Sequence, residues 1–226
     1  MDIFDIIGPV MIGPSSSHTA GAVRIGAVAR KILGEKITRA EVFFAGSFAE
    51  TYRGHGTDKA ILGGLLGMQS DDERIRDSFR HAEEAGMEFV FATISLPRAH
   101  PNTVRIRLVG ESGGECTVQG ASVGGGNVLI TGVNGMETAF SGKADTLIIP
   151  HRDMPGVIAS VSSLMADCGV NIGNFRLNRP HKGFQAIMTV ELDGGIPDEA
   201  LRLLTGLKHV DSVVYLPANR NGDAQC

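Results

Sequence analysis

The stretch Gly13-Pro14-Ser15-Ser16-Ser17-His18-Thr19 begins the first helix that the sequence predicts. Apolar residues then recur at the spacing i, i+3, i+4, i+7 and i+8 that places them on one helix face: Ile25, Val28, Ala29, Ile32 and Leu33. Gly34 is expected to end this helix. Ser15, Ser16 or Ser17 is expected to cap its start.

The same stretch contains more polar groups than a helix cap needs. One hydroxyl is enough for a cap, whereas three serines, a threonine and an imidazole gather at this helix start. Free backbone N–H groups at a helix start already favour a carboxylate or a phosphate. The stretch Gly13–Thr19 therefore predicts a binding site for a small anion.

Composition is that of a soluble globular protein with many tight turns. Of the 226 residues, 42% are hydrophobic, 20% are charged and 30 are glycine. The net charge of −4, the absence of tryptophan and the lack of a basic stripe argue against nucleic acid or an anionic membrane as a partner. No apolar run has the length of a membrane span, and the acidic start Met1–Asp5 does not resemble a signal peptide, so a cytoplasmic location is expected.

The order of predicted elements indicates an α+β protein of two domains. A mixed α/β domain is expected at residues 1–141, with strands at 39–45, 88–96, 103–109, 115–122 and 127–131, a helix from Thr57-Asp58, and another from a capping box at Ser70 and Glu73. Residues 145–217 show the order βαββαβ of a ferredoxin-like domain, and 218–226 are expected to be a flexible tail.

Three further segments of the first domain carry polar groups that suit a ligand. They are Arg53-Gly54-His55-Gly56-Thr57-Asp58-Lys59, His100-Pro101-Asn102-Thr103, and Ser122-Val123-Gly124-Gly125-Gly126-Asn127. Each alone is a modest signal, because each also fits an ordinary turn. Gly124–Gly126 can present consecutive N–H groups in a nest. Together the segments supply hydroxyls, imidazoles, an amide and backbone donors, which suit a small polar anion such as an amino acid.

The cysteines do not form a metal or disulfide pattern. Cys116, Cys168 and Cys226 are scattered, and no pair has the C-x-x-C spacing. Three distant thiols are a poor cage for a metal cluster, and no metal ligands are predicted in this chain. Cys226 is expected to be an incidental exposed thiol.

The motifs GPSSSHT, GHGTDKA, HPNT and SVGGG, in that order, resemble the β chain of the iron–sulfur-dependent L-serine dehydratases. The resemblance implies deamination of L-serine to pyruvate and ammonia. It places the reaction at a [4Fe–4S] cluster whose cysteines belong to a separate α chain, with one iron acting as Lewis acid on the serine hydroxyl. It also implies an N-terminal domain related to the allosteric substrate-binding domain of some phosphoglycerate dehydrogenases. A need for a monovalent cation is left open.

The resemblance also implies site residues. Ser15, Ser16, Ser17, His18 and Thr19 would line the substrate site at the junction of the subunits. His55, Thr57, Asp58, His100, Asn102, Gly124, Gly125 and Gly126 would support it. The candidates for proton transfer are His18, His55 and His100, and the sequence does not choose among them.

The second domain is similar to an ACT domain, a regulatory module that binds amino acids. The similarity rests on His151-Arg152-Asp153-Met154-Pro155-Gly156-Val157 and on Asn171. It makes His151, Asp153 and Asn171 candidate allosteric residues, although Asp at 153 replaces an expected Asn and would repel a carboxylate. An ACT domain used only for self-association, through its edge strands, is an equal alternative.

Two other functions compete with the dehydratase subunit. A stand-alone amino-acid sensor would bind its ligand without joining an active site. A hydrolase that uses Ser17 is a weaker alternative, because the chain has no G-x-S-x-G elbow.

Overall fold

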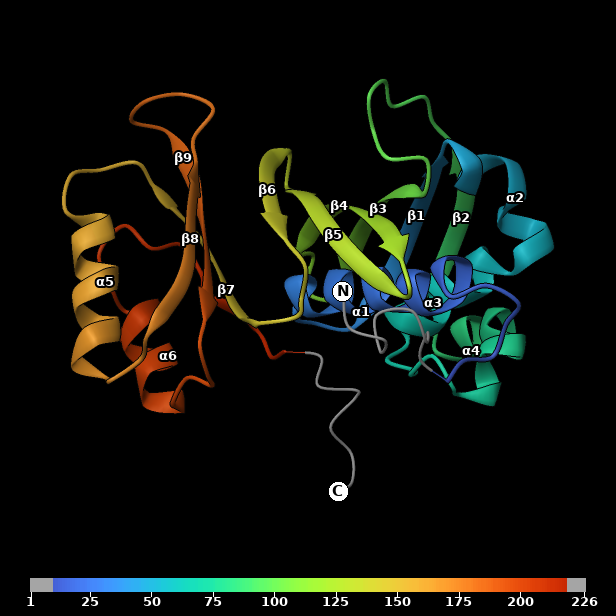
Figure 1. The fold of residues 1–226 in the computed structure, drawn as a ribbon, viewed down its shortest axis with the longest axis horizontal. Coiled ribbons are helices and arrows are strands. Elements are labelled where there is room, and N and C mark those ends of the chain that lie inside the picture. Colours follow the sequence, from blue (N-terminus) through green and yellow to red (C-terminus); the bar gives the residue numbers. More distant parts are fainter. Residues whose placement is uncertain (1–9, 219–226) are drawn as a thin grey trace. The chain divides into compact units, whose positions relative to one another are not determined.

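The computed structural model of the chain describes residues 10–218 (Figure 1). Two compact units divide between Asn134 and Gly135. The sequence places the seam at 141–144. The difference arises from β6 (Met136–Phe140), a short strand that the sequence did not predict and that packs within the second unit against β8 and β9. Of the expected tail at 218–226, residues 219–226, with Cys226, lie outside the described residues.

The first unit contains a twisted mixed sheet. Its strands are β1 (Ile37–Ala45), β2 (Glu88–Thr93), β3 (Thr103–Gly110), β4 (Glu115–Gly124) and β5 (Asn127–Val133), in the spatial order β2-β1-β3-β4-β5. Only the β1–β2 pair among these is parallel. The alternation of Val104, Ile106 and Leu108 with Thr103, Arg105 and Arg107 predicts one buried face and one basic face for β3. The three apolar residues are fully buried, and Arg107 is exposed and pairs with Glu115 at 3.0 Å, but Thr103 is buried as well.

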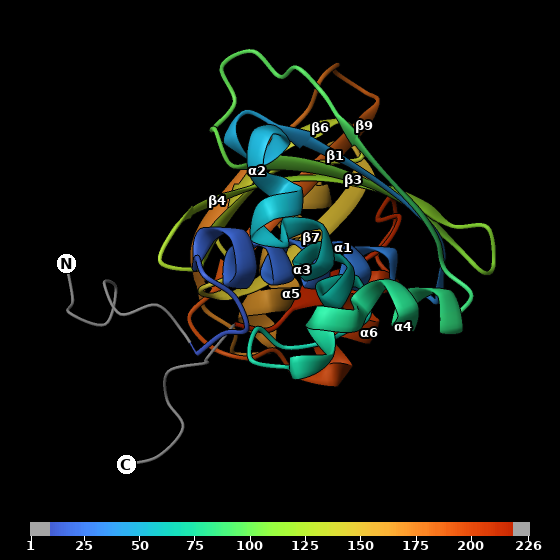
Figure 2. The same cartoon turned by 90° about the vertical axis from the view of Figure 1, so that its right-hand side faces the viewer.

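Helices gather on one side of this sheet, as Figure 2 shows. They are α1 (Ala22–Leu33), α2 (Ser47–His55), α3 (Thr57–Leu65) and α4 (Ser78–Glu84), with a π-helical turn, η2 (Ser17–Gly21), before α1 and a 3-10 turn, η3 (Glu73–Asp77), before α4. The predicted end of α1 is confirmed, since Gly34 adopts a left-handed φ of 74°.

Of the three serines expected to cap the helix start, Ser15 meets a free backbone N–H, because its Oγ accepts from the His18 N–H at 3.5 Å. Ser16, at the start of η2, makes no side-chain capping bond, and its carbonyl accepts instead from the Gly21 N–H at 3.0 Å. The predicted capping box at Ser70 and Glu73 was wrong: the Asp72 carboxylate accepts from the Arg74 N–H, while the Ser70 hydroxyl donates to the Val10 carbonyl.

Helices α1 and α3 cross in backbone contact. A Cβ added at Gly64 would lie 2.1 Å from the Val23 carbonyl oxygen, and one added at Gly26 would lie 2.5 Å from the Ile61 carbonyl oxygen. Glycine is therefore required at both crossing positions. The close approach fixes how η2, which precedes α1, lies against α3.

The second unit contains an antiparallel sheet covered on one face by two helices, as seen in Figure 1. Its elements after β6 are β7 (Asp145–Arg152), α5 (Val157–Asp167), β8 (Ile172–Asn178), β9 (Gln185–Leu192), α6 (Asp198–Thr205) and β10 (Val214–Leu216). The predicted order βαββαβ is confirmed, and the strands lie in the order β10-β7-β9-β8.

The apolar spacing predicts that the buried face of α5 carries Val157, Ile158, Val161, Leu164, Met165 and Cys168, and the observed buried face is narrower. Val157, Val161 and Met165 are buried at the spacing i, i+4, i+8, whereas Ile158 is 44% exposed. The expectation that Ile158 shares the buried face was therefore wrong, because it follows Val157 by one position and turns away from the core. No helix in the described part of the chain has the length and apolar character needed to span a membrane.

Candidate functional site

His18 lies at the centre of the predicted site, on the first turn of η2. Its side chain is buried, with 9% of the residue exposed. Its Nδ1 lies 3.1 Å from the Ser15 Oγ, and its Nε2 lies 3.0 Å from the Thr51 Oγ1. Both ring nitrogens are therefore engaged by hydroxyl groups, and the ring is held in one orientation.

His55 ends α2 and stands edge-on to His18, with 4.5 Å between the ring centroids. Phe48, fully buried on the same helix, contacts the His18 ring at 5.1 Å. Burial lowers the pKa of His18, and the neighbouring His55 lowers it further. The His18 imidazole is consequently neutral at neutral pH and able to accept a proton.

Thr51 is a site residue that sequence reasoning missed. It lies on α2, a helix that the sequence did not predict. Phe48, Thr51 and His55 follow one another at i, i+3 and i+7, which is the spacing of one helix face. That spacing was the signal available in the sequence, and it leads to the three side chains that contact His18.

Thr57 and Asp58 begin α3, directly after His55-Gly56, and both are buried. The Thr57 Oγ1 has no hydrogen-bond partner among the described residues, although the residue is fully buried. Burial raises the pKa of Asp58, against the opposing effect of the Lys59 N–H that donates to its carboxylate at 2.8 Å. A buried hydroxyl without a partner and a buried carboxylate without a cationic partner at hydrogen-bond distance are both suited to a polar ligand.

The remaining residues of the opening stretch differ in their roles. Thr19 is buried, and a Cβ at Gly13 would lie 2.1 Å from its Oγ1. Glycine at position 13 therefore leaves the room that the Thr19 side chain needs. Ser16 and Ser17 are half-buried, and their hydroxyls form no hydrogen bond within the described chain. Ser15 is the serine that bonds to the histidine ring.

The Gly124–Gly126 run forms the turn between β4 and β5. Gly124 pairs with Asn127, and the two residues between them, Gly125 and Gly126, have φ values of 58° and 77°. Positive φ at both positions is what a tight hairpin turn requires, so the glycines also have a structural reason to be there. The Gly126 carbonyl accepts a 2.6 Å bond from Arg24 of α1, a half-buried cation that the sequence did not single out.

The segment His100–Thr103 is linked to the same region through its backbone. The exposed His100 uses its Nδ1 to accept from the Asn102 N–H at 3.1 Å. The Asn102 carbonyl accepts from the Ser122 N–H at 3.0 Å, and the buried Ser122 side chain lies against Gly21 of η2. Among the described residues, no hydrogen bond or ring contact joins His100 to His18. The structure thus brings Ser15 and His55 each into contact with His18, but not His100.

The three candidate allosteric residues of the second unit are each held by a different partner. His151 is buried on β7, with its Nδ1 3.1 Å from the Ile149 carbonyl. The Asp153 carboxylate accepts from the Gly183 N–H and from Arg179, and these bonds lower its pKa. The Asn171 amide donates to the Asp193 carboxylate.

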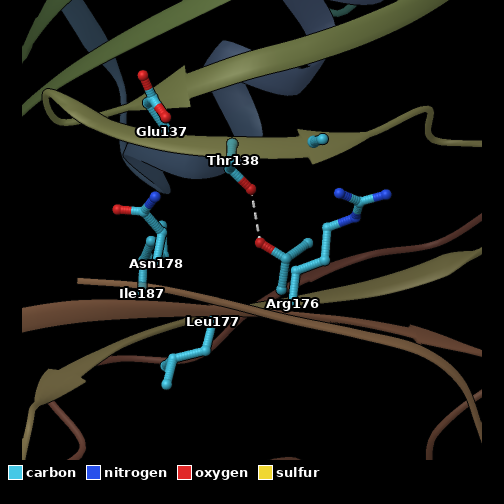
Figure 3. Close-up of a pocket in the computed structure, with 8 residues that line it drawn as sticks. Glu137, Thr138, Arg176, Leu177, Asn178 and Ile187 are labelled. Atoms are coloured by element: carbon cyan, nitrogen blue, oxygen red, sulfur yellow. Dashed lines mark hydrogen bonds between the residues drawn. The ribbon is translucent and has the colours of Figure 1, made fainter. Parts of the chain in front are cut away.

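A cavity of about 380 Å³ lies elsewhere in the second unit, between β6 and the β8–β9 edge of the sheet (Figure 3). It is lined by Glu137, Thr138, Ala139, Arg176, Leu177, Asn178, Ile187 and Thr189. The hydroxyls of Thr138 and Thr189 meet across it at 2.6 Å. Figure 3 shows Arg176 and Asn178 directed from β8 toward β6 and Leu177 directed away. None of the three candidate allosteric residues lines this cavity.

The described thiols do not suit a metal cluster. Burial raises the pKa of Cys116 to about 12, so that it remains a thiol rather than a thiolate. Cys168 ends α5 and packs against the core of the second unit. No group of three His, Cys, Asp or Glu side chains within residues 10–218 could hold a metal ion. The described residues therefore do not fit an iron–sulfur cluster.

The similarity of this chain to known proteins includes the N-terminal motifs and extends over nearly the whole chain. A family model described as serine dehydratase beta chain matches residues 1–86. A probable L-serine dehydratase β chain of Bacillus subtilis is 46% identical over 214 residues, 95% of this chain and 97% of that one. An L-serine dehydratase β chain of Peptoniphilus asaccharolyticus is 37% identical over 94% of this chain and 96% of that one.

A more distant likeness concerns a larger enzyme. The D-3-phosphoglycerate dehydrogenase of Synechocystis sp. is 28% identical over 186 residues, which are 81% of this chain but 33% of that protein. The segment similar to this chain thus makes up about a third of that longer polypeptide.

Proposed function

The chain belongs to the family of L-serine dehydratase β chains, and from this premise we propose how it serves an enzyme that converts L-serine to pyruvate and ammonia. It is a lyase subunit, with L-serine as substrate and a separate α chain as partner. The conversion requires that L-serine lose its α-proton and its β-hydroxyl group. The cluster of Ser15, His18 and His55 is the part of this chain that would face the substrate.

The observation that carries this assignment is the state of His18. Its ring is buried, held between two hydroxyls, and kept neutral by burial and by His55. A general base is most effective when its pKa lies near the working pH, because it is then both unprotonated and basic enough to accept a proton. His18 fits the base that removes the α-proton, and the exposed His55 beside it can exchange that proton with solvent.

Asp58 is suited to the substrate ammonium group. The carboxylate is buried at the start of α3, three residues after His55, and has no salt bridge within the described chain. A zwitterionic amino acid would supply the missing cation, and the hydroxyls of Ser16 and Ser17 would receive its carboxylate. Thr57, whose buried hydroxyl lacks a partner, would complete the polar lining.

Replacing Asp58 with Asn is expected to stabilise the chain and weaken substrate binding. The folded-state pKa of Asp58 lies above its unfolded value, so the ionised carboxylate costs stability that grows as pH rises through this range. Asp58→Asn should add about 1 kcal/mol to the free energy of unfolding at neutral pH, with a smaller gain at acid pH. It should also raise KM for L-serine about tenfold or more. Urea unfolding at neutral and acid pH measures the change in the free energy of unfolding, with Asp77→Asn as the exposed control. An unchanged KM for L-serine in the assembled enzyme would argue against a role of Asp58 in binding the ammonium group.

The [4Fe–4S] cluster would be held by the α chain. This proposal is supported by the described thiols, of which one is buried with a raised pKa and the other is packed against a core. When bound next to the His18 site, the cluster would supply a Lewis acid for the departing hydroxyl group. This chain would contribute the proton acceptor and the polar groups that orient L-serine.

The second unit would act as an ACT-type regulatory or self-association domain. Its βαββαβ order and the strand order β10-β7-β9-β8 support this proposal. The outer strand β8 presents Phe175 and Leu177, each 36% exposed, along an edge with no further strand in this sheet. Such an edge suits pairing with a second copy. Because Arg179 and Gly183 already occupy the Asp153 carboxylate, the self-association role has the better support.

Co-purification with the α chain tests the subunit assignment. A tag on this chain should recover the α chain from anaerobically grown cells that express both, and the pair should form pyruvate and ammonia from L-serine. The matched samples are each chain expressed alone, prepared in the same way. Rapid serine turnover by this chain alone, without metal, would overturn the assignment.

A further inference from the structure

The hydrogen bonds around His18 determine which of its ring nitrogens carries the proton. A threonine hydroxyl has one hydrogen to donate. The Thr51 Oγ1 donates it to the Ser47 carbonyl at 2.7 Å, one helical turn earlier in α2. Toward the His18 Nε2, 3.0 Å away, Thr51 can therefore act only as an acceptor. The Nε2 must carry the hydrogen.

The other side of the ring follows from this assignment. A neutral imidazole with a hydrogen on Nε2 has a lone pair on Nδ1. The Ser15 hydroxyl, 3.1 Å from Nδ1, is then the donor of that bond, and its oxygen faces the His18 backbone N–H at 3.5 Å. The polarity runs in one direction, from the Ser15 hydroxyl through the ring and Thr51 to the Ser47 carbonyl.

We propose that Thr51 is a positioning residue that fixes the Nε2–H tautomer of His18, and that Ser15 is the hydroxyl through which His18 takes a proton from the substrate. This inference rests on the proposed function. In the step, the Ser15 oxygen takes the α-proton of L-serine as it passes its own hydrogen to the His18 Nδ1. Ser15 remains a neutral hydroxyl, the ring becomes an imidazolium, and the pair of electrons from the C–H bond stays with the substrate.

Accessibility supports the indirect route. The His18 ring is buried, and protein hydroxyls occupy both of its nitrogens. Ser15 is half-buried and precedes η2, so a ligand reaches its oxygen more readily than the ring. This route also gives Ser15 a role that Ser16 and Ser17 do not have, whereas the sequence alone did not distinguish the three serines.

Other charged groups around η2 must be considered when pH effects are measured. Those on the elements packed against it are Arg24, Arg30 and Lys31 on α1, Glu50, Arg53 and His55 on α2, Asp58 and Lys59 on α3, and Glu115 on β4; β5 has no charged residue. Of these, His55 lowers the His18 pKa. Loss of Thr51 as an acceptor would weaken the bond that the imidazolium donates, and would lower that pKa further.

Nitrogen-15 NMR of the histidine rings in the full chain tests the tautomer directly. The spectrum of wild type should show the hydrogen on the His18 Nε2, and Thr51→Val should give a mixture of tautomers while Thr51→Ser restores the single form. A wild-type ring protonated on Nδ1 would overturn the proposal. Because the readout needs no turnover, its failure is distinct from failure of the proposed function, which would appear as no pyruvate from the wild-type complex.

Kinetics of the complex with the α chain provide the second readout. Thr51→Val should reduce kcat about tenfold with little change in KM, and should move the acid limb of the pH profile to lower pH; Thr51→Ser should recover both. Ser15→Ala should reduce kcat at least as much. The matched control is Thr205→Val, which removes the same type of bond, from Thr205 to the Leu201 carbonyl at 2.9 Å, in α6. A Thr51→Val enzyme with the kcat and pH profile of Thr205→Val would contradict the positioning role.

Discussion

Replacing His18 with Gln is expected to lower kcat of the assembled enzyme by a factor of about 10²–10⁴, the usual contribution of a general base. Glutamine has a similar size and can still meet the hydroxyls of Ser15 and Thr51, but it cannot accept the α-proton. KM should change much less than kcat, because the groups that bind L-serine remain. Pyruvate formation at saturating L-serine, measured on complexes of equal purity, gives the result.

His81→Gln is the control for this experiment. His81 lies in the same unit on α4 and pairs with the surface carboxylate of Glu84 at 3.3 Å. The His81→Gln substitution should leave kcat unchanged. If His18→Gln kept the full maximal rate and altered only the response to an effector, the chain would be a sensor rather than part of the active site.

Replacing Gly64 with Ala is expected to destabilise the first unit by about 3 kcal/mol. The added Cβ would lie 2.1 Å from the Val23 carbonyl oxygen and 2.9 Å from the Ala27 nitrogen, both of them backbone atoms that cannot rotate away. Helices α1 and α3 would have to separate, and η2 with His18 would shift with α1. Urea unfolding followed by circular dichroism measures the loss.

Gly54→Ala provides the matched helical glycine. A Cβ at Gly54 would meet no atom within 4 Å, and alanine is the better helix former, so stability should be unchanged or rise by about 0.5–1 kcal/mol. Equal stability of the two variants would mean that the helix crossing is not as close as the structure has it.

Local patterns in the sequence were sufficient for the elements with strong periodicity. The apolar stripe ending at Gly34 predicted α1, the alternation in 103–109 predicted β3, and the second unit showed its full βαββαβ order. In each case the hydrophobic spacing and the turn residues agree. Helix α2 was missed because its nine residues include Gly54 and few apolar side chains, and packing rather than propensity stabilises it.

The site was predictable only in part, for a similar reason. The density of hydroxyls around His18 was visible in Ser15–Thr19, and the structure places His55 beside it. Thr51 could not be singled out by type, since its role depends on a contact with a residue 33 positions away. The exposed His100 has a recognisable motif, but its ring bonds to its own loop, which only the folded chain reveals.

We propose that this chain supplies part of a serine site whose other part lies on the α chain. The most direct measurement is the rate of pyruvate formation from L-serine as this chain is titrated into a fixed amount of α chain carrying its cluster. The rate should be negligible without this chain, rise in proportion to it, and become constant when the two chains are equal in amount. A full rate from the α chain alone, or a rate that does not respond to this chain, would contradict the account.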